Sequence, residues 1–460
     1  MVYKFRRYLG AFSRHNSQGL AYLMSRGKRI LMLLENGGFP EDTRVAQEAF
    51  ALRDAGYQVR VISPTDSFAS SKFEMVSGVA TYRYPAPPEW GGFVGYVVEY
   101  VYSLTITAII SFYIFLRHGF DALHVHTPPD MYVTIGFFYK IFSVKYVMDH
   151  HDLSPELYQA QSDGEGNSLV YRVLCWFERR SCRLADQLIS TNQTQRSTAI
   201  ERCGVDPDKT NVVRNGPNIL DEITAAPIDA LRPEGRTVVG YLGCIGYQDG
   251  VDSFIRALKV MVDKFERTDF HAVIIGDGPA VPSLKALVNE LALDDHVVFP
   301  GYLKGETLQS HLVSCDIFVT PDPPSDYNVT CTMMKTMEYM ALSRPIVGYD
   351  LPEHRFSAGD ASLYATPDDE VDFAKCLLEL IDNPELQSSM GAIGRTRVES
   401  ELAWHHQKKS LVEAYRKLFG ESPPSNLNST ESETTDHSTE PSSESPAQPI
   451  PSDSPHHLHG

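Results

Sequence analysis

The sequence predicts an α/β protein made of two Rossmann-like halves, each with a parallel sheet that helices cover on both faces. Short apolar runs typical of buried strands alternate with helical stretches, and this alternation stops near the middle of the chain and then restarts. The 460 residues are too many for one hydrophobic core and suit two domains. A hydrophobic content of 42% with 10% aromatic residues is ordinary for a globular protein.

The first domain is expected over residues 29–218. It opens with a buried-strand run at 30–34, a loop that contains Gly and Pro, and a helix at 44–55 that Gly56 ends. Further strands are expected at 58–64, 122–126, 145–149, 187–191 and 211–215. Because helical stretches separate these strands, we expect them to pair in parallel.

A linker is expected at 219–236, because residues 216–236 hold three prolines and little periodicity. The alternation then restarts and defines a second domain over 237–402. Its strand runs, some with their following turns, are expected at 237–243, 271–279, 296–302, 315–321 and 345–350. Its helices are expected at 252–265, around 284–291 and from Met333 onward, and a last helix at 404–418 falls in a separate segment, 403–420.

Both ends of the chain differ in composition from its middle. Residues 1–28 form a basic arm in which Phe5, Tyr8, Leu9 and Phe12 would share a helical face, which fits either an anionic membrane surface or an unstructured extension. Residues 421–460 hold ten Ser, seven Pro and seven acidic residues but no Lys, Arg or aromatic residue. Such a composition cannot bury a core and predicts a disordered tail.

Two apolar stretches bear on membrane contact. Residues 100–116 carry no charge but contain Ser, Thr and Tyr, so a buried or surface-lying helix is favoured over a transmembrane one. Residues 137–146 are apolar and basic, and docking on an anionic inner leaflet is weighed equally with burial in the first domain.

The net charge and the cysteine content argue against several classes of protein. A formal charge of −18 argues against a general nucleic-acid binder. Seven scattered cysteines without a Cys-x-x-Cys motif favour reduced thiols over disulfides or a zinc site, and the N-terminus lacks the apolar core of a secretory signal. We therefore expect a cytoplasmic protein, with peripheral contact to the inner face of the cell membrane through the basic arm left open.

Candidate site residues follow the predicted strands, where parallel α/β sheets bind their ligands. Gly37 and Gly38 follow the first strand and would let backbone approach a ligand, although a tight turn without a ligand explains them equally well. Gly276, in "GDGP", is a turn of the same kind. His126 ends another strand and could bond a sugar hydroxyl or stabilise developing charge, or simply bond backbone.

The stretch "DHHDLSPE" brings together Asp149, His150, His151, Asp152 and Glu156, which are the residue types of a metal site. Adjacent residues on an extended chain point to opposite sides, so these five cannot all reach one ion. Acceptor binding or a structural corner is therefore favoured, no metal site is expected, and Asp149, His150 and His151 are the acceptor-side candidates.

The stretch "TCTMMKTMEYMA" predicts a helix that Thr332 caps, with Met333, Met334 and Lys335 in its first turn. The free amides, the positive helix end and Lys335 would cradle a diphosphate, and Glu338 one turn later could accept two ribose hydroxyls. An ordinary amphipathic helix with a Lys335–Glu338 ion pair explains the same spacing.

Several segments in order resemble the family 4 retaining glycosyltransferases of the GT-B fold, over nearly everything between residues 29 and 418. They read "NGGFPEDTRV", "DHHDLSPELY", "VVRNGP", "GYLGCIGYQDGVD" and "MEYMALSRPIVGYDLPEHRFSAGD". The likeness is strongest to bacterial members that build lipopolysaccharide, exopolysaccharide or capsule. It implies two Rossmann-like domains facing across a cleft, with the donor on the C-terminal domain, the acceptor on the N-terminal one, and the last helix crossing back to the first domain.

The resemblance also assigns roles. Glu338 matches the second glutamate of the E-x7-E motif, which holds the nucleotide ribose, and His126 matches the histidine near the transferred sugar. Gly37 and Gly38 match the loop over the donor phosphates. The stretch 300–303, with Tyr302 and Leu303, is similar to the one whose backbone reads the base.

This chain departs from the family pattern at the donor side. Thr330 stands in the place of the first motif glutamate. Many members carry an Arg and a Lys that grip the diphosphate, where this chain has Tyr241 and Asp249. Lys335 could supply the missing positive charge from the neighbouring helix.

The function implied by the resemblance is transfer of a hexose or N-acetylhexosamine from a nucleoside-diphosphate sugar, with UDP expected, to a lipid-linked or saccharide acceptor with retention. The context would be cell-surface polysaccharide assembly, and no cofactor is expected beyond the nucleotide-sugar. His126 and Lys335 are the expected catalytic residues. The expected donor-binding residues are Gly37, Gly38, Gly276, Tyr302, Leu303, Thr332, Met333, Lys335 and Glu338.

Two other functions compete. A sugar-nucleotide epimerase shares the fold but needs its own set of carboxylate and histidine, which we do not find in the sequence. A catalytically degenerate scaffold, which binds sugar nucleotides or recruits a partner transferase, would explain Thr330 and the missing Arg and Lys. The sequence does not decide between donor sugars, acceptors or oligomeric states.

Overall fold

The computed structural model describes residues 27–65, 72–86, 92–161, 166–218 and 225–422. The basic arm up to residue 26, and with it the helical face expected there, lies outside the described residues. So does the tail from residue 423. Between residues 225 and 236, within the expected linker, the chain forms two short 3-10 turns, Asp229–Leu231 and Pro233–Gly235.

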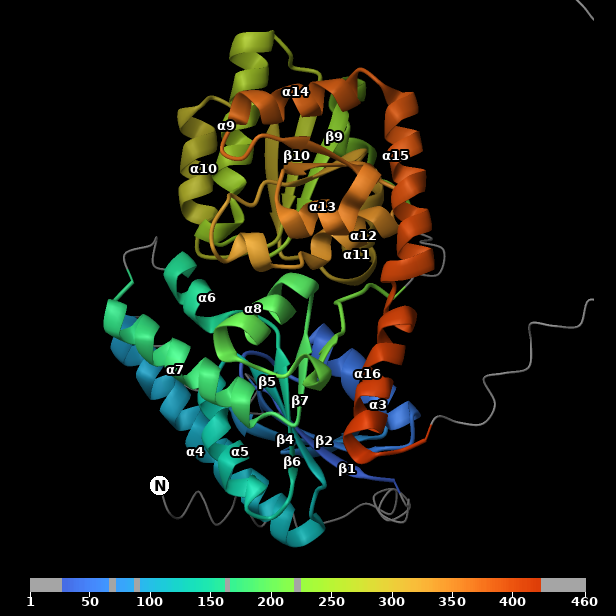
Figure 1. The fold of residues 1–460 in the computed structure, drawn as a ribbon. Helices are drawn as coiled ribbons and strands as arrows, with labels where there is room; N and C mark the ends of the chain where they lie inside the picture. Colours follow the sequence, from blue (N-terminus) through green and yellow to red (C-terminus); the bar gives the residue numbers. More distant parts are fainter. Residues whose placement is uncertain (1–26, 66–71, 87–91, 162–165, 219–224, 423–460) are drawn as a thin grey trace, which may run out of the picture. The chain divides into compact units, whose positions relative to one another are not determined.

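The first sheet has eight strands in the order β3-β4-β2-β1-β5-β6-β7-β8, and every neighbouring pair is parallel except β3–β4 (Figure 1). The strands are β1 (Arg29–Leu33), β2 (Gln58–Thr65), β3 (Phe73–Val76), β4 (Val79–Pro85), β5 (Ala122–Thr127), β6 (Lys145–His150), β7 (Gln187–Ser190) and β8 (Thr210–Val212). The helices between them are α3 (Thr43–Asp54), α4 (Gly92–His118), α5 (Val133–Lys140), α6 (Ser154–Gln161), α7 (Ser168–Leu184) and α8 (Gln193–Cys203).

The second sheet has six parallel strands in the order β11-β10-β9-β12-β13-β14. They are β9 (Thr237–Leu242), β10 (Phe270–Ile275), β11 (Val297–Gly301), β12 (Ile317–Thr320), β13 (Ile346–Tyr349) and β14 (Ser362–Ala365). The helices are α9 (Val251–Phe265), α10 (Val281–Glu290), α11 (Gly305–Ser314), α12 (Met334–Ala341), α13 (Pro352–Ala358), α14 (Glu370–Ile381), α15 (Pro384–Arg397) and α16 (Trp404–Phe419).

The core of each half lies on both faces of its sheet. Strand β1 alternates between two apolar clusters, because Leu31 and Leu33 pack on one face while Ile30 and Met32 pack on the other. Parallel strands that are buried on both faces have continuous apolar sequences, so β1, β5, β9 and β10 could be predicted from the sequence.

Helix α16 packs against the first half. It contacts α3, β7 and β8, and the rings of Tyr57 and Tyr415 lie 5.7 Å apart. Figure 1 shows α16 beside α3, far from it in sequence. The predicted fold class, two Rossmann-like domains with a last helix that crosses back to the first, is confirmed.

Two parts of the sheets were missing from the sequence prediction. The hairpin β3–β4 extends the first sheet at one edge, and β14 closes one edge of the second. The strand expected at 211–215 ends at Val212. Arg214, two residues beyond the end of this strand, donates a hydrogen bond to Glu353 and is not part of the sheet.

One described helix, Val97–His118 within α4, is long and apolar enough to cross a membrane by length and composition alone. About 28% of its most apolar window is buried inside the protein. The helix expected at 100–116 therefore exists, and it begins earlier than the uncharged stretch.

Candidate active site

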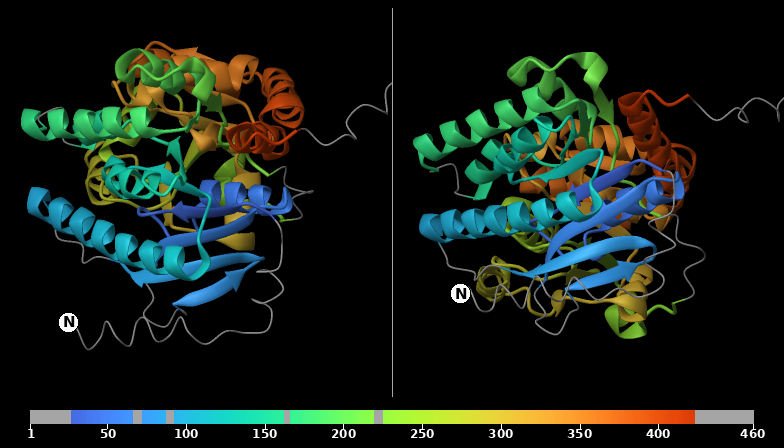
Figure 2. Two further views of the ribbon diagram at one scale, coloured as in Figure 1. Left: turned by 60° about the horizontal axis from the view of Figure 1, so that its bottom comes forward. Right: turned by 90° about the horizontal axis from the view of Figure 1, so that it is seen from below.

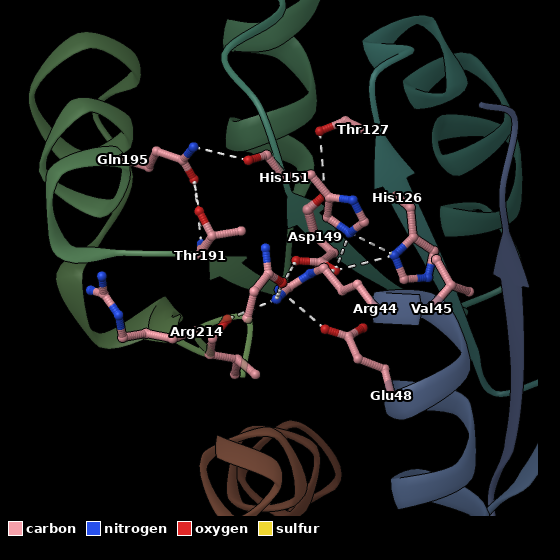
Figure 3. A network of polar contacts seen from close by, with 12 residues as sticks. Arg44, Val45, Glu48, His126, Thr127, Asp149, His151, Thr191, Gln195 and Arg214 are labelled. Atoms are coloured by element: carbon pink, nitrogen blue, oxygen red, sulfur yellow. Dashed lines mark hydrogen bonds and ion pairs between the residues drawn. The ribbon is translucent and has the colours of Figure 1, made fainter. Parts of the chain in front are cut away.

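The carboxyl ends of β5 and β6 bring the histidine-rich loops together. These strands pair in parallel with His126 opposite Asp149 and Thr127 opposite His150. His126 Nδ1 lies 3.1 Å from Asp149 Oδ2, and His151 Nε2 lies 2.6 Å from the same oxygen (Figure 3). The structure therefore joins two residues that the sequence analysis had assigned separate roles, His126 as catalytic and Asp149 as acceptor-side.

Arg44 of α3 is the counter-ion of this cluster, and sequence analysis did not single it out. Its Nε and Nη2 donate to the two oxygens of Asp149 at 2.9 and 2.7 Å, and Nη2 lies 3.1 Å from Glu48 Oε1. Figure 3 shows the guanidinium between the two carboxylates. Burial by itself raises the pKa of Asp149, but Arg44 and His151 outweigh it and hold that pKa well below its usual range.

Below the cluster, His124 joins helix α16 to the first sheet. The Tyr415 hydroxyl bonds His124 Nδ1 at 2.9 Å, and the imidazoles of His124 and His126 stack with centroids 4.4 Å apart. Ligand atoms of Glu48, His124, His126 and Asp149 all lie within 4.8 Å of one another. Since Arg44 already hydrogen-bonds Asp149 and lies 3.1 Å from Glu48, this donor set fits an internal ion-pair network better than a cation site.

One of the unpaired atoms in this cluster, Nε2 of His126, points to a function. His126 is 1% exposed, and its Nε2 has no hydrogen-bond partner among the described residues. Burial lowers the pKa of His126, so the ring is neutral near pH 7. A buried, neutral imidazole with a free nitrogen at a strand end is suited to bond a hydroxyl of a bound ligand.

His150 lies on the opposite side of β6, as the alternation of an extended chain requires. Its Nε2 is 3.4 Å from Glu178 Oε1 in a separate buried network with Arg202. Burial alone lowers the pKa of His150, but Glu178 outweighs it and raises that pKa. His150 therefore does not converge with the other acceptor-side candidates, Asp149 and His151.

The loop after β1 lies next to the loop that follows β5. Asn36 Nδ2 donates to the carbonyl of Pro128 at 3.1 Å. A Cβ at Gly38 would lie 2.8 Å from Glu41 Oε2, and Asp42 caps α3 by accepting from the Val45 amide. These contacts place Gly37 and Gly38 beside the His126 strand end.

In the second half, α12 starts one residue later than predicted. Met333 is its N-cap residue and makes no side-chain hydrogen bond to the helix. Thr332 lies one residue earlier, and its hydroxyl accepts from Asn192 Nδ2 at 3.0 Å. The predicted capping role of Thr332 is wrong. Met333 and Lys335 still occupy the start of the helix.

Lys335 pairs with carboxylates other than Glu338. Its Nζ lies 2.7 Å from Asp322 Oδ1 and 4.0 Å from Asp249 Oδ1, and 4.8 Å from the centre of the Tyr241 ring. Burial alone lowers the pKa of Lys335, but Asp322 and Asp249 outweigh it and raise that pKa. Two of the three positions at which this chain departs from the family pattern, Tyr241 and Asp249, thus lie beside the lysine.

Glu338 has no partner. It is half-buried on α12 and makes no side-chain hydrogen bond or ion pair with any residue that the structure describes. Burial raises its pKa. The alternative explanation of the spacing, an ion pair between Lys335 and Glu338, therefore does not apply.

The other donor-side candidates have mixed surroundings. A Cβ at Gly276, where φ is +140°, would lie 1.9 Å from the carbonyl oxygen of Gly243, so this glycine packs one loop on another. Tyr302 is 68% exposed with Lys304 over its ring at 5.0 Å, and Leu303 packs partly against the core.

Loops of the first half bond directly to the α12 loop. Asn192 Nδ2 donates to the Thr330 carbonyl at 2.7 Å, and the Tyr327 hydroxyl donates to Asp152 at 3.2 Å. Arg214, labelled in Figure 3, donates to Glu353 at 2.9 Å. The sequence analysis did not select Asn192 or Arg214 as site residues. Each follows a strand, and this position is the one signal in the sequence that could have identified them.

Two family models match the chain in sequence. Residues 42–216 match the model described as "Glycosyl transferase 4-like domain", and residues 236–383 match "Glycosyl transferases group 1". Together these matches span most of the described chain and both sheets.

Similar proteins carry related descriptions. The 2-deoxystreptamine glucosyltransferase of Streptomyces kanamyceticus is 23% identical over 65% of this chain and 78% of its own length. Alpha-maltose-1-phosphate synthase of Mycolicibacterium smegmatis is 24% identical over 60% of this chain and 74% of its own length.

Among solved structures, sucrose-phosphate synthase from Thermosynechococcus elongatus superposes with a TM-score of 0.71 at 18% identity, covering 85% of this chain and 99% of that one. The Anabaena protein HepE, in complex with UDP and glucose, has a TM-score of 0.63 at 15% identity over 85% of this chain and 100% of that one. At these identities the likeness shows the fold.

Proposed function

The chain belongs to the family 4 glycosyltransferases of the GT-B fold, and we propose that it moves a hexose or N-acetylhexosamine from a UDP-sugar to a lipid-linked or saccharide acceptor with retention. The proposed context is the assembly of a cell-surface polysaccharide on the cytoplasmic side of the membrane. HepE, a structure similar in fold, is described with UDP and glucose bound, which supports UDP as the first donor base to test.

The unpaired carboxylate of Glu338 is the observation that carries the donor assignment. The half-buried carboxylate of Glu338 accepts no hydrogen bond from a described residue, so its oxygens are open to donors on a ligand. Two vicinal hydroxyls, as in a ribose, would supply two donors at once. Glu338 stands one turn from the start of α12, so a ribose on it would leave the diphosphate close to the helix amides.

His126 is proposed to act on the sugar itself. In the reaction an acceptor hydroxyl oxygen bonds to the anomeric carbon, the bond from that carbon to the β-phosphate oxygen breaks, and the hydroxyl proton passes to the departing phosphate. The free Nε2 of His126 would bond the sugar as charge develops there. Asp149 holds the ring from its other nitrogen, which fixes its orientation.

Lys335 would meet the departing diphosphate together with the amides at the start of α12. Its ammonium already pairs with Asp322 and lies 4.0 Å from Asp249, so a diphosphate would compete with these two carboxylates. The positive charge offered to the donor therefore depends on how many of the two are ionised. Burial outweighs the attraction of Lys335 and raises the pKa of Asp249.

One observation favours the degenerate scaffold as a second candidate. Thr330, in the place of the first motif glutamate, is buried and donates its hydroxyl to the Tyr327 carbonyl at 2.8 Å. It holds the loop and offers the sugar no carboxylate. A scaffold would bind sugar nucleotides through Glu338 without turning them over.

Calorimetric titration of the purified full chain with UDP, GDP and UDP-GlcNAc tests the donor assignment. We expect micromolar binding of a UDP compound, lost at least tenfold in Glu338→Gln, because the amide accepts fewer hydroxyl bonds and carries no charge (about 1.4 kcal/mol for each factor of ten). The matched control is Glu379→Gln on α14, an exposed glutamate that should bind as the wild type does. No binding by the wild type, or equal loss in both variants, would contradict the assignment.

A further inference from the structure

Helix α4 has its polar and apolar faces reversed relative to a water-exposed helix. Ser103, Thr107 and Ser111 recur every four residues, and all three are fully buried. They bond Glu35, Tyr132 and Tyr139 at 3.0, 3.2 and 3.0 Å. The opposite side carries five exposed large apolar residues, Val97, Val101, Ile109, Phe112 and Leu116.

The apolar face continues onto α5 and the turn after it. Phe137, Phe138, Ile141 and Phe142 are all exposed, and the ring of Phe138 lies 6.2 Å from that of Phe112. A groove of about 580 Å³ runs between the two helices, lined mainly by apolar side chains such as Leu104, Ala108 and Ile135. We call these nine exposed residues and the groove the α4–α5 face.

Single exposed apolar residues are normal on a soluble protein, but a continuous face of nine is not. Figure 2 shows α4 as a long helix running along the side of the first sheet. The hydroxyls on its inner side already form hydrogen bonds with Glu35, Tyr132 and Tyr139 of the same domain. Crossing a membrane would strip α4 from those partners, so the helix is built to lie on an apolar phase rather than to span one.

The charges around the face select the partner. Glu99 is the one acidic residue of α4, and residues 100–120 and 131–148 contain no Asp or Glu, while Arg117, Lys140 and Lys145 lie among them. Lys140 pairs with Asp186, and Arg117 and Lys145 are exposed. The first acidic residue of the chain is Glu35, after seven basic ones, so the chain before it carries only positive charge.

We propose that the α4–α5 face docks in the plane of an anionic lipid bilayer, with its apolar side chains in the acyl boundary and its basic residues at the headgroups. An apolar face with a basic rim is the pattern of interfacial binding to anionic lipid. In a symmetric dimer through this face the same basic residues would approach one another, which disfavours a second copy as the occupant. The inference does not depend on the proposed sugar transfer, since docking needs no donor.

Vesicle co-sedimentation of the full chain, without nucleotide, tests the proposal. We expect binding to vesicles with 30% phosphatidylglycerol and weak binding to pure phosphatidylcholine. The double variant Phe112→Ser with Phe138→Ser should lose about tenfold or more in partition coefficient, because two large side chains no longer leave water. Ile393→Ser on α15, an exposed apolar residue away from the face, is the control and should bind as the wild type does.

The charges are tested separately. Arg117→Gln with Lys145→Gln should weaken binding to the anionic vesicles by about fivefold per residue and leave the phosphatidylcholine value unchanged. Since these four positions are exposed, all variants should keep the wild-type unfolding temperature, which differential scanning fluorimetry checks.

Three results would overturn the proposal. Wild-type protein that binds neither vesicle removes the need for a lipid partner. Loss of binding in an Arg6→Gln and Arg7→Gln variant, but not in the face variants, would assign binding to the arm alone. A wild-type dimer in light scattering that becomes monomeric in the Phe112→Ser and Phe138→Ser variant would make the face a contact between copies.

Discussion

Arg44 is the residue on which the buried cluster behind His126 depends. It neutralises Asp149 and lies 3.1 Å from Glu48, and all three side chains are buried. Replacing Arg44 with Met should lower the free energy of unfolding by about 3–5 kcal/mol, because it leaves the carboxylate of Asp149 buried without its counter-charge.

Urea unfolding followed by fluorescence measures this loss. The matched control is Arg256→Met, whose partner Asp252 is solvent-exposed and whose loss should be under about 1 kcal/mol. Equal effects of the two substitutions would show that the Arg44 network adds nothing to stability.

Glu35 makes stability depend on pH. Burial raises its pKa to about 7 from an ordinary value of 4.5. A carboxyl whose folded pKa is raised contributes stability that is complete below pH 4.5 and is lost as pH rises through about 7. Glu35→Gln, which is neutral at every pH, should therefore unfold at a higher temperature than the wild type at pH 8 and at nearly the same temperature at pH 5.

Thermal unfolding of both proteins from pH 5 to pH 8 gives that difference directly, and other titrating groups cancel in it. The full effect approaches about 3 kcal/mol at pH 8. A difference that stays constant with pH would mean that Glu35 is ionised in the folded protein throughout this range.

Asp249 tests what Lys335 does. Its carboxylate lies 4.0 Å from the lysine, and replacing it with Asn removes one of the two negative charges beside the ammonium. Asn still accepts from the Gly246 amide, which Asp249 Oδ2 accepts now at 2.9 Å. If Lys335 faces the donor diphosphate, Asp249→Asn should tighten UDP binding by about three- to tenfold, since an opposing charge is gone.

Uridine, which has no phosphate, is the control ligand in the same calorimetric titrations. Its affinity should not change in Asp249→Asn. Unchanged UDP affinity would mean that Lys335 only holds its loop in place.

At the scale of elements, the sequence predicted those parts of the fold whose partners lie close by or whose burial is complete. Strands buried on both faces stood out as apolar runs, and the helices between them by their period. The edge strands β3 and β4 were missed because their runs mix charged and apolar residues, as in "FEMV" and "VATYRYP".

The candidate site was predictable only in part. His126, Asp149 and His151 were visible because they end strands, but their pairing was not. Arg44 and Asp149 are 105 positions apart, and nothing local in α3 shows which strand it faces. Thr332 was predicted to cap the helix because threonine is common at N-cap positions. In the structure its hydroxyl instead accepts a hydrogen bond from Asn192, which is far away in sequence.

The loop containing Gly276 gives an element-scale prediction. A Cβ at this position would overlap the Gly243 carbonyl, so Gly276→Ala should displace the loops that follow β9 and β10. We expect a loss of more than about 2 kcal/mol in stability together with weaker nucleotide binding.

The control is Gly301→Ala, because Gly301 also has a positive φ, of +83°, but nothing lies within 4 Å of a Cβ there. It should cost only about 1 kcal/mol, the strain of the left-handed backbone. Equal losses would mean that backbone conformation alone, without the close approach of the two loops, explains the requirement for glycine.

For the whole molecule, membership of the glycosyltransferases rests on both halves of the chain, since one family model matches each. Under the proposed function, the first half would supply His126 and its buried supports, and the second would supply Glu338 and Lys335. Helix α16 joins the two, because it follows the second sheet in sequence and bonds His124 beneath the histidine cluster. A transferase needs all of these, whereas a scaffold needs only the nucleotide side.

The most direct test of the central claim is sugar transfer from labelled UDP- and GDP-sugars to a bacterial lipid extract, measured with the wild type and His126→Ala. The account predicts that the wild type transfers label from one UDP-sugar with retained anomeric configuration, and that His126→Ala is slower by about a hundredfold or more while still binding UDP. A wild type that binds UDP but neither transfers nor hydrolyses any of these donors would contradict the account and identify the chain as a scaffold.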